Sequence, residues 1–282
     1  MLLLASCSSG GIGIGNLPSP TPTLTVTPAP PTATPVPSAG TVNGETIPLA
    51  EFSAEVTRYQ AAQATPAPEA EAQRVVFDDL VAQILLAQGA AEAGFTLDDA
   101  ALQARIEALA AQVGGAEQLS AWQQEHGYNQ EDFKAALRRA SAAAWMRDKI
   151  IAAVPLSAPQ VHIRQILLYN EEVAQKYADQ LQAGADFDAL AAQVDPVTGG
   201  DIGWFPRNYL AETAVEEAAF SLQAGATSAI IPSQVGYHLL KLLETQPDRP
   251  LSPDALQTLQ TRALKEWLAQ RRQQSTIVSN LN

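Results

Sequence analysis

Three glycines between residues 199 and 203 invite a chemical interpretation, because closely spaced glycines can let a backbone approach a phosphate group. A phosphate loop also needs a lysine after the glycines and a helix that opens directly behind them. No lysine follows directly after Gly203, and no helix is expected to begin there. We therefore interpret Gly199, Gly200 and Gly203 as parts of a tight turn.

Histidine and cysteine offer few further possibilities. His126, His162 and His238 lie far apart, and Cys7 is the single cysteine, so the sequence contains neither a zinc motif nor a disulfide pair. We expect no metal and no cofactor. A lone histidine in a strand is more often a hydrogen-bonded core residue than a reactive group, so both interpretations stay open for His238. We expect His126 and His162 at the surface.

The charge balance excludes one class of partner. The chain has 30 Asp and Glu against 17 Lys and Arg, a formal net charge of −13. A phosphate backbone is bound by a basic surface, so we expect no nucleic-acid partner. Anionic lipid head groups would be repelled as well, so any membrane association must come from an anchor.

Such an anchor is predicted at Cys7. An apolar run, Leu2-Leu3-Leu4, is followed by Ala5-Ser6 and then the cysteine, as in a bacterial lipobox, so we expect residues 1–16 to be a lipoprotein signal remnant and anchor. The alternative interpretation is a disordered start. Eight prolines follow between residues 17 and 38, which excludes helix and sheet interiors, so residues 17–40 are predicted to be an extended linker. An anchored stalk fits a location outside the cytoplasm.

Residues 161–243 read as a compact α/β unit. Residues 161–168 alternate in polarity at first and then become apolar on both sides, which predicts a strand. Amphipathic periodicity and turn residues predict three helices and two more strands behind it. The helices are expected at residues 171–183, 186–194 and 213–222, and the strands at residues 227–232 and 237–243.

The part before this unit is predicted to be helical. Asn43-Gly44 between apolar residues predicts a tight hairpin turn, and at least four helices are expected between it and residue 154. Thr96 and Asn129 are expected to begin two of them, each with an aspartate three residues later. A last helix opens at Ser252-Pro253. Its apolar stripe could pack on the α/β unit or return to the N-terminal helices.

The order of four segments carries a resemblance. The segments are Val161-His162-Ile163-Arg164-Gln165-Ile166-Leu167-Leu168, Gly184-Ala185-Asp186-Phe187, Gly199-Gly200-Asp201-Ile202-Gly203-Trp204-Phe205 and Gly236-Tyr237-His238-Leu239-Leu240-Lys241-Leu242. In that order they resemble a parvulin-type peptidyl-prolyl isomerase domain. The whole layout resembles the SurA and PrsA class of extracytoplasmic folding factors. The resemblance implies an α+β fold with a helical SurA-like chaperone domain at residues 41–154, a small mixed-sheet parvulin domain at residues 155–248, and a closing helix at residues 249–282 that packs on the N-terminal domain.

The resemblance also implies a chemistry and a set of residues. Rotation about an X-Pro bond crosses a barrier of about 18–20 kcal/mol, and an enzyme lowers it by binding the twisted amide better than either planar form. This requires an apolar cup for the proline ring and polar groups around the amide. The polar ring implied by the resemblance consists of Asp195, His238, Gln165 and Ser233. The substrate-binding residues that it implies are Ile202, Leu210, Val215, Phe220 and Trp204.

Two positions depart from the family pattern. Gln165 stands where parvulins usually have a histidine, and Val215 stands where a bulkier side chain is common, so a weak activity is expected. The favoured function is a peptidyl-prolyl isomerase that assists folding of exported proteins. Its expected partners are unfolded exported chains with X-Pro bonds, and the membrane through Cys7. A non-catalytic chaperone that binds unfolded chains is the alternative. An anchored adhesion module is a third hypothesis, motivated by the stalk.

Overall fold

The computed structural model describes residues 37–281, which begin with a β-hairpin. Strand β1 (Ser38–Val42) pairs antiparallel with β2 (Glu45–Pro48). Asn43 and Gly44 join the strands with φ angles of 51° and 85°, the left-handed values that a two-residue hairpin turn requires. The predicted Asn-Gly turn is confirmed. Residues 38–40 were expected to end the linker but form the start of β1, because β1 gains a partner on both sides. Cys7 and the rest of the linker lie outside the described residues.

Five helices follow the hairpin, in agreement with the predicted helical region. They are α1 (Leu49–Ala62), α2 (Glu69–Glu92), α3 (Asp99–Val113), α4 (Ala116–Glu125) and α5 (Gln130–Ala152). Asn129 caps α5 as predicted, since its side chain accepts a hydrogen bond from the Asp132 N–H at 2.8 Å. The cap of α3 is Asp98 and not Thr96, because the Asp98 carboxylate accepts from the Ala101 N–H at 2.8 Å.

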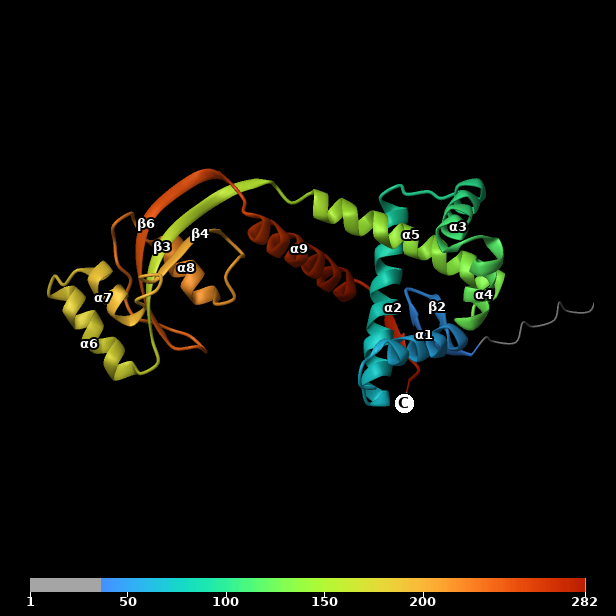
Figure 1. The fold of residues 1–282 in the computed structure, drawn as a ribbon, viewed down its shortest axis with the longest axis horizontal. Helices are drawn as coiled ribbons and strands as arrows, with labels where there is room; N and C mark the ends of the chain where they lie inside the picture. The colour runs from blue at the N-terminus through green and yellow to red at the C-terminus, as the bar shows by residue number, and fades with distance from the viewer. Residues whose placement is uncertain (1–36, 282) are drawn as a thin grey trace, which may run out of the picture. The chain divides into compact units, whose positions relative to one another are not determined.

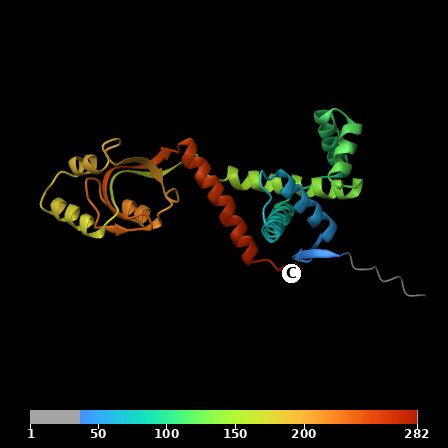
Figure 2. The same cartoon turned by 60° about the horizontal axis from the view of Figure 1, so that its bottom comes forward.

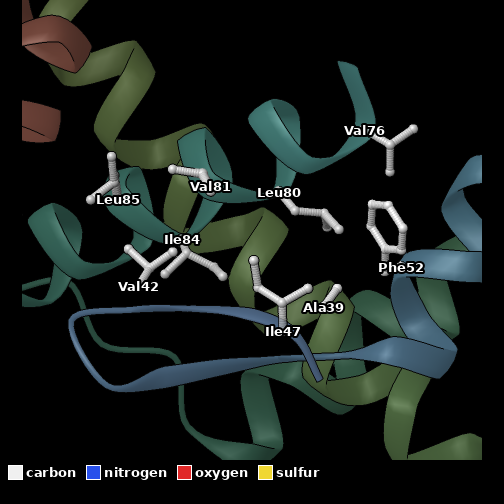
Figure 3. Packing of buried hydrophobic residues seen from close by; sticks show 9 residues of the cluster. All are labelled: Ala39, Val42, Ile47, Phe52, Val76, Leu80, Val81, Ile84 and Leu85. Atoms are coloured by element: carbon white, nitrogen blue, oxygen red, sulfur yellow. The ribbon is translucent and has the colours of Figure 1, made fainter. Parts of the chain in front are cut away.

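The core of this helical domain lies between the hairpin and one face of α2. Figure 3 shows Ile84 of α2 directed toward the strands that carry Val42 and Ile47, and Leu80 and Leu85 of α2 belong to the same buried cluster. The α2 residues of this cluster, which are Val76, Leu80, Val81, Ile84 and Leu85, recur at the three- and four-residue spacing of one helix face, as the sequence pattern predicted. The side chains of Val42, Ile47, Leu80, Ile84 and Leu85 are each at most 2% exposed, so burial of their apolar surface stabilises this domain.

The C-terminal segment completes the same domain. Helix α9 (Pro253–Gln273) is capped by Ser252 as predicted and packs against α2 and α5, which is the second of the two partners considered for its apolar stripe. Strand β7 (Ile277–Ser279) then pairs with β1, so that the three-stranded sheet has the order β2-β1-β7. Strand β7, just before the end marked C in Figures 1 and 2, accordingly lies beside β1.

A second sheet forms the α/β unit. Its strands are β3 (Ser157–Leu168), β4 (Asp201–Pro206), β5 (Ile231–Pro232) and β6 (Tyr237–Pro250), in the order β4-β3-β6-β5. All of its strand pairs are antiparallel, where a mixed sheet was expected. The strand predicted at residues 227–232 is reduced to a bridge at Thr227 and the short β5. Figure 1 shows β3 and β6 running side by side.

Helices cover both faces of this sheet, which explains why the end of β3 is apolar on both sides. Helices α6 (Glu171–Gln182) and α7 (Phe187–Val194) pack with Ile166, Leu168 and Leu239 on one face. Helix α8 (Thr213–Ser221) packs with Ile163, Leu240 and Leu242 on the other. Figure 1 shows α6 and α7 on one side of the strands and α8 on the other. Within residues 37–281, no helix has both the length and the apolar content to cross a bilayer.

Candidate active site

Three of the polar side chains singled out in the sequence meet on the sheet face that α8 covers. The Nε2 atom of His238 lies 2.7 Å from the Ser233 hydroxyl oxygen, and its Nδ1 atom lies 3.0 Å from the Gln165 side-chain carbonyl oxygen. Antiparallel pairing of Leu167 with His238 and of Gln165 with Leu240 puts Gln165 of β3 and His238 of β6 on the same face of the sheet. Ser233 begins the turn between β5 and β6, where its N–H donates to the Gly236 carbonyl at 2.7 Å.

The surroundings of the histidine in this group favour its neutral form. Its side chain is 3% exposed, and burial lowers the pKa of His238 below the ordinary histidine value. Because the Gln165 oxygen can only accept, the Nδ1–H of His238 donates to it, and Nε2 accepts from the Ser233 hydroxyl. The Ser233 oxygen in turn accepts from the Val235 N–H at 3.1 Å. These contacts form one chain of neutral hydrogen bonds from Val235 to Gln165.

One polar group of the chain of hydrogen bonds is not used inside the domain. The side-chain NH₂ of Gln165 makes no hydrogen bond to any residue between 37 and 281, and Gln165 is half-buried. A primary amide has two donors, so this group can donate to a carbonyl oxygen or to a developing lone pair of a bound molecule. Glutamine therefore supplies here a donor that does not depend on pH.

Asp195 is not part of this hydrogen-bonded group. Its carboxylate accepts from the Thr198 hydroxyl and from the N–H groups of Val197 and Thr198, the latter two at 3.0 and 3.1 Å. The hydrogen bonds from Thr198 and then from Val197 hold the pKa of Asp195 below its usual value. The structure brings Gln165, His238 and Ser233 together, whereas the Asp195 side chain makes its hydrogen bonds within its own turn.

The Asp195 turn nevertheless packs directly on Gln165. The Gln165 N–H donates to the Gly200 carbonyl at 2.8 Å, and a Cβ atom on Gly200 would lie 2.0 Å from the Gln165 carbonyl oxygen. Gly200 has a φ angle of 75°. Both the close approach and the left-handed backbone require glycine at this position. The glycine turn predicted from the sequence therefore acts as a spacer between the Asp195 turn and Gln165.

The apolar residues that the sequence assigned to a proline cup divide into three groups. Leu210, Val215 and Phe220 pack together around Phe205 on the same sheet face as His238. Val215 is 2% exposed and belongs to the core beneath the other two, which are half-buried. Ile202 is 40% exposed and lies outside this cluster.

Trp204 faces away from the cluster. It pairs across the strands with His162, and their rings are tilted with centroids 5.3 Å apart. The Arg249 guanidinium covers the Trp204 ring at 4.4 Å from its centroid. Phe205 is its neighbour in β4 and is completely buried on the α8 side, so alternation along the strand directs Trp204 to the other face. His162, expected at the surface, is half-buried and lies 2.7 Å from the Asp201 carboxylate.

One charged residue near the site was missed in the sequence. Glu216 in α8 is 7% exposed, and its carboxylate accepts hydrogen bonds from three consecutive backbone N–H groups in the loop that carries Leu210. Glu-Glu in an amphipathic helix reads as a solvated face. The signal that could have found Glu216 is its spacing, because it lies three and four residues before Ala219 and Phe220, which belong to the apolar face.

Two segments of the chain match known protein families. Residues 169–244 match the rotamase family, the PPIC-type PPIase domain, and residues 32–137 match the SurA-like N-terminal domain. A SurA-like N-terminal domain thus precedes a PPIC-type PPIase domain in this chain.

Several relatives found by sequence carry the name foldase protein PrsA. The foldase protein PrsA of Caldanaerobacter subterraneus subsp. tengcongensis is 41% identical over 83 residues, which are 28% of this chain and 27% of the relative. Foldase protein PrsA 1 of Bacillus cereus is 29% identical over 132 residues, 44% of this chain and 46% of the relative. These matches therefore cover less than half of the length of either relative. A crystal structure of peptidylprolyl isomerase PrsA from Bacillus cereus aligns over 81% of this chain and 83% of its own, with 22% identity and a TM-score of 0.45.

Proposed function

We propose that residues 155–248 are a peptidyl-prolyl cis/trans isomerase and that the whole chain is a foldase for exported proteins. The observation that carries this proposal is the neutral group of Gln165, His238 and Ser233 on the same sheet face as the half-buried Leu210 and Phe220. Ser233 and His238 lie within residues 169–244, which match the PPIC-type PPIase domain, and Gln165 precedes that match in the same strand, β3. Polar donors beside an apolar surface are what a twisted prolyl amide requires.

The proposed mechanism is noncovalent. In the planar amide, the nitrogen lone pair is delocalised into the carbonyl group, and this delocalisation creates the barrier to rotation. At the twisted state the nitrogen becomes pyramidal and its lone pair accepts a hydrogen bond. The free NH₂ of Gln165 is the donor we assign to the twisted amide. His238 fixes the orientation of the Gln165 side-chain amide by donating to its oxygen, and Ser233 fixes the tautomer of His238.

The remaining predicted residues have different roles in this proposal. Leu210 and Phe220 provide the apolar surface for the proline ring, and Val215 supports them from below. Ile202 lies outside that cluster, so we assign it to flanking residues of the substrate, and Trp204, on the other face of the sheet, has no role in this proposal. We keep Asp195 as a member of the site through its turn, since Gly200 at the end of this turn contacts the backbone of Gln165. No step requires Asp195 to accept a proton.

A peptide assay tests this function. Wild-type protein should accelerate the isomerisation of a short X-Pro peptide, and His238→Ala should lower kcat/KM by about tenfold to a hundredfold, which corresponds to a lost buried hydrogen bond network. His162→Ala is the matched control, because His162 is a hydrogen-bonded strand histidine of the same domain outside the proposed site. An absence of acceleration by folded wild-type protein rejects the proposal, and an equal loss in both variants rejects the assignment of His238.

We further propose that the protein acts outside the cytoplasm, attached to the membrane by a lipid on Cys7. The support is the lipobox-like sequence before Cys7, the proline-rich linker after it, and the similarity to foldase proteins. Unfolded exported chains with X-Pro bonds are the proposed substrates. Expression in a bacterium with a labelled fatty acid should label the wild type and leave Cys7→Ser unlabelled. Equal labelling of both proteins would contradict the assignment of Cys7.

A further inference from the structure

Glu216 is a buried carboxylate close to the proposed prolyl site. It lies in the first turn of α8, is 7% exposed, and accepts hydrogen bonds from the backbone N–H groups of Asn208, Tyr209 and Leu210 at 2.6, 2.9 and 3.0 Å. A buried charge is costly unless hydrogen bonds replace its hydration. Three charge-assisted bonds fulfil this requirement, so the carboxylate and the loop stabilise each other.

The backbone of this loop is shaped to converge on an anion. Asn208 has a φ angle of 66°, one of two positive values among non-glycine residues between 37 and 281. A left-handed residue in such a loop turns successive N–H groups toward one point, which creates a concave anion site. In this protein the anion is the side chain of Glu216 itself. The loop conformation therefore depends on a residue in the following helix.

The loop that Glu216 holds carries part of the proposed substrate surface. Leu210 at its end packs in the cluster with Val215 and Phe220. At its beginning, the Arg207 guanidinium lies over the Phe220 ring, 4.2 Å from the centroid. Release of the loop would move Leu210 away from Phe220 and would free Arg207. The Asn208 carbonyl of this loop also accepts a hydrogen bond from Arg262 of α9 at 3.1 Å, but Glu216 alone binds the three N–H groups that lead to Leu210.

We propose that Glu216 is a positioning residue for proline binding: its carboxylate fixes residues 208–210 so that Leu210 and Phe220 present a preformed apolar wall to the substrate. The inference rests on the proposed isomerase function. Glu216 itself does not touch the substrate. Since the wall contacts the proline ring in the planar and the twisted states alike, its loss weakens binding of both and raises KM more than it changes kcat.

Glu216→Gln tests this role with little change in side-chain volume. The amide is neutral and replaces one acceptor oxygen by a donor, so it cannot accept all three N–H groups. Glu217→Gln is the matched control, because Glu217 is the adjacent, exposed residue of the same helix. We expect Glu216→Gln to raise KM for an X-Pro peptide by about tenfold, as for loss of a hydrogen bond to a charged group, with kcat within about twofold. We expect Glu217→Gln to match the wild type.

A second readout separates positioning from general destabilisation. If Glu216→Gln merely lowered the fraction of folded protein, apparent kcat would fall while KM stayed constant. Amide hydrogen exchange followed by NMR should become faster at Asn208, Tyr209 and Leu210 and remain unchanged in β6. Glu216→Asp keeps the charge but is one methylene shorter. It should shift KM in the same direction, and it carries the test if the glutamine variant does not fold.

The outcomes separate the inference from the proposed function. A folded wild type without isomerase activity overturns both. An active wild type whose KM is the same in Glu216→Gln, or whose residues 208–210 keep their amide protection in that variant, overturns the positioning role and leaves the isomerase proposal intact.

Discussion

Gly200→Ala should separate the Asp195 turn from the backbone of Gln165, whereas the same change at the neighbouring Gly199 should not. Both glycines have positive φ angles, 62° at Gly199 and 75° at Gly200, so alanine at either position costs roughly 1–2 kcal/mol in backbone strain. Their surroundings differ. A Cβ atom on Gly199 has no neighbour within 4 Å, but on Gly200 it lies 2.0 Å from the Gln165 carbonyl oxygen.

The extra cost at Gly200 follows from that contact. The Gln165 carbonyl belongs to the backbone of a central strand and cannot rotate away, so the turn must leave and break the 2.8 Å bond from the Gln165 N–H to the Gly200 carbonyl. An unsatisfied buried amide costs about 1–3 kcal/mol. Gly200→Ala should therefore destabilise the sheet by about 2–5 kcal/mol in total, and Gly199→Ala by about 1–2 kcal/mol.

Hydrogen–deuterium exchange of the full chain measures this difference directly. The free energy of opening for the peptides at residues 161–168 and 237–243 should fall more in Gly200→Ala than in Gly199→Ala by about 2 kcal/mol, with the helical domain unchanged. Isomerase activity should follow the same order. Equal exchange in the two variants would refute the spacer role of Gly200.

Two further perturbations test other parts of the account. Burial lowers the pKa of His238 in the folded state, so below about pH 6.5 the unfolded chain binds a proton at this residue more readily than the folded domain does. The free energy of unfolding should therefore be constant above about pH 7 and decline as pH falls below about 6.5. His238→Gln should remove this dependence in urea titrations at several pH values. A Cβ atom on Gly89 of α2 would lie 2.7 Å from the Trp267 ring of α9, so Gly89→Ala should destabilise the helical domain by about 1–3 kcal/mol. The double variant with Trp267→Phe should recover part of this loss in chemical denaturation, and an unaltered midpoint in Gly89→Ala would show that α9 does not pack there.

Local signals in the sequence predicted local structure well. Asn129 and Ser252 begin α5 and α9 as expected, because each cap is a hydrogen bond to an N–H only three residues away. The turn at Asn43-Gly44 is likewise decided by its own two φ angles. Features of this kind depend on neighbouring residues along the chain and can be recognised without tertiary contacts.

Nonlocal contacts decided the elements that the sequence did not predict. Strand β6 continues to Pro250 through polar residues, partly because the buried amide of Gln160 donates to the carbonyl groups of Arg249 and Pro250. At residues 227–232 the expected strand is interrupted after Thr227. The Leu240 N–H donates its hydrogen bond to the Ser228 hydroxyl oxygen and not to a backbone carbonyl, as it would in a regular strand pair. The residue patterns of these segments do not predict these hydrogen-bond partners.

The site was predictable in part. Resemblance to parvulins supplied Gln165, His238 and Ser233, which the structure brings within hydrogen-bonding distance. It also supplied Asp195, whose carboxylate accepts hydrogen bonds from its own turn, and Trp204, which strand alternation directs to the sheet face opposite His238. Spacing along a sequence gives the order of residues, but the direction of a side chain depends on local turns and on strand register.

Two-dimensional exchange NMR on an X-Pro peptide at equilibrium tests the central claim most directly. With a catalytic amount of the full chain, cross-peaks between the cis and trans forms should appear at mixing times far below the tens of seconds of the uncatalysed reaction. They should weaken strongly with Ser233→Ala, which removes the hydroxyl that His238 accepts from. Cross-peaks equally strong with Ser233→Ala, or none with the wild type, would contradict the assignment of this group to prolyl isomerisation.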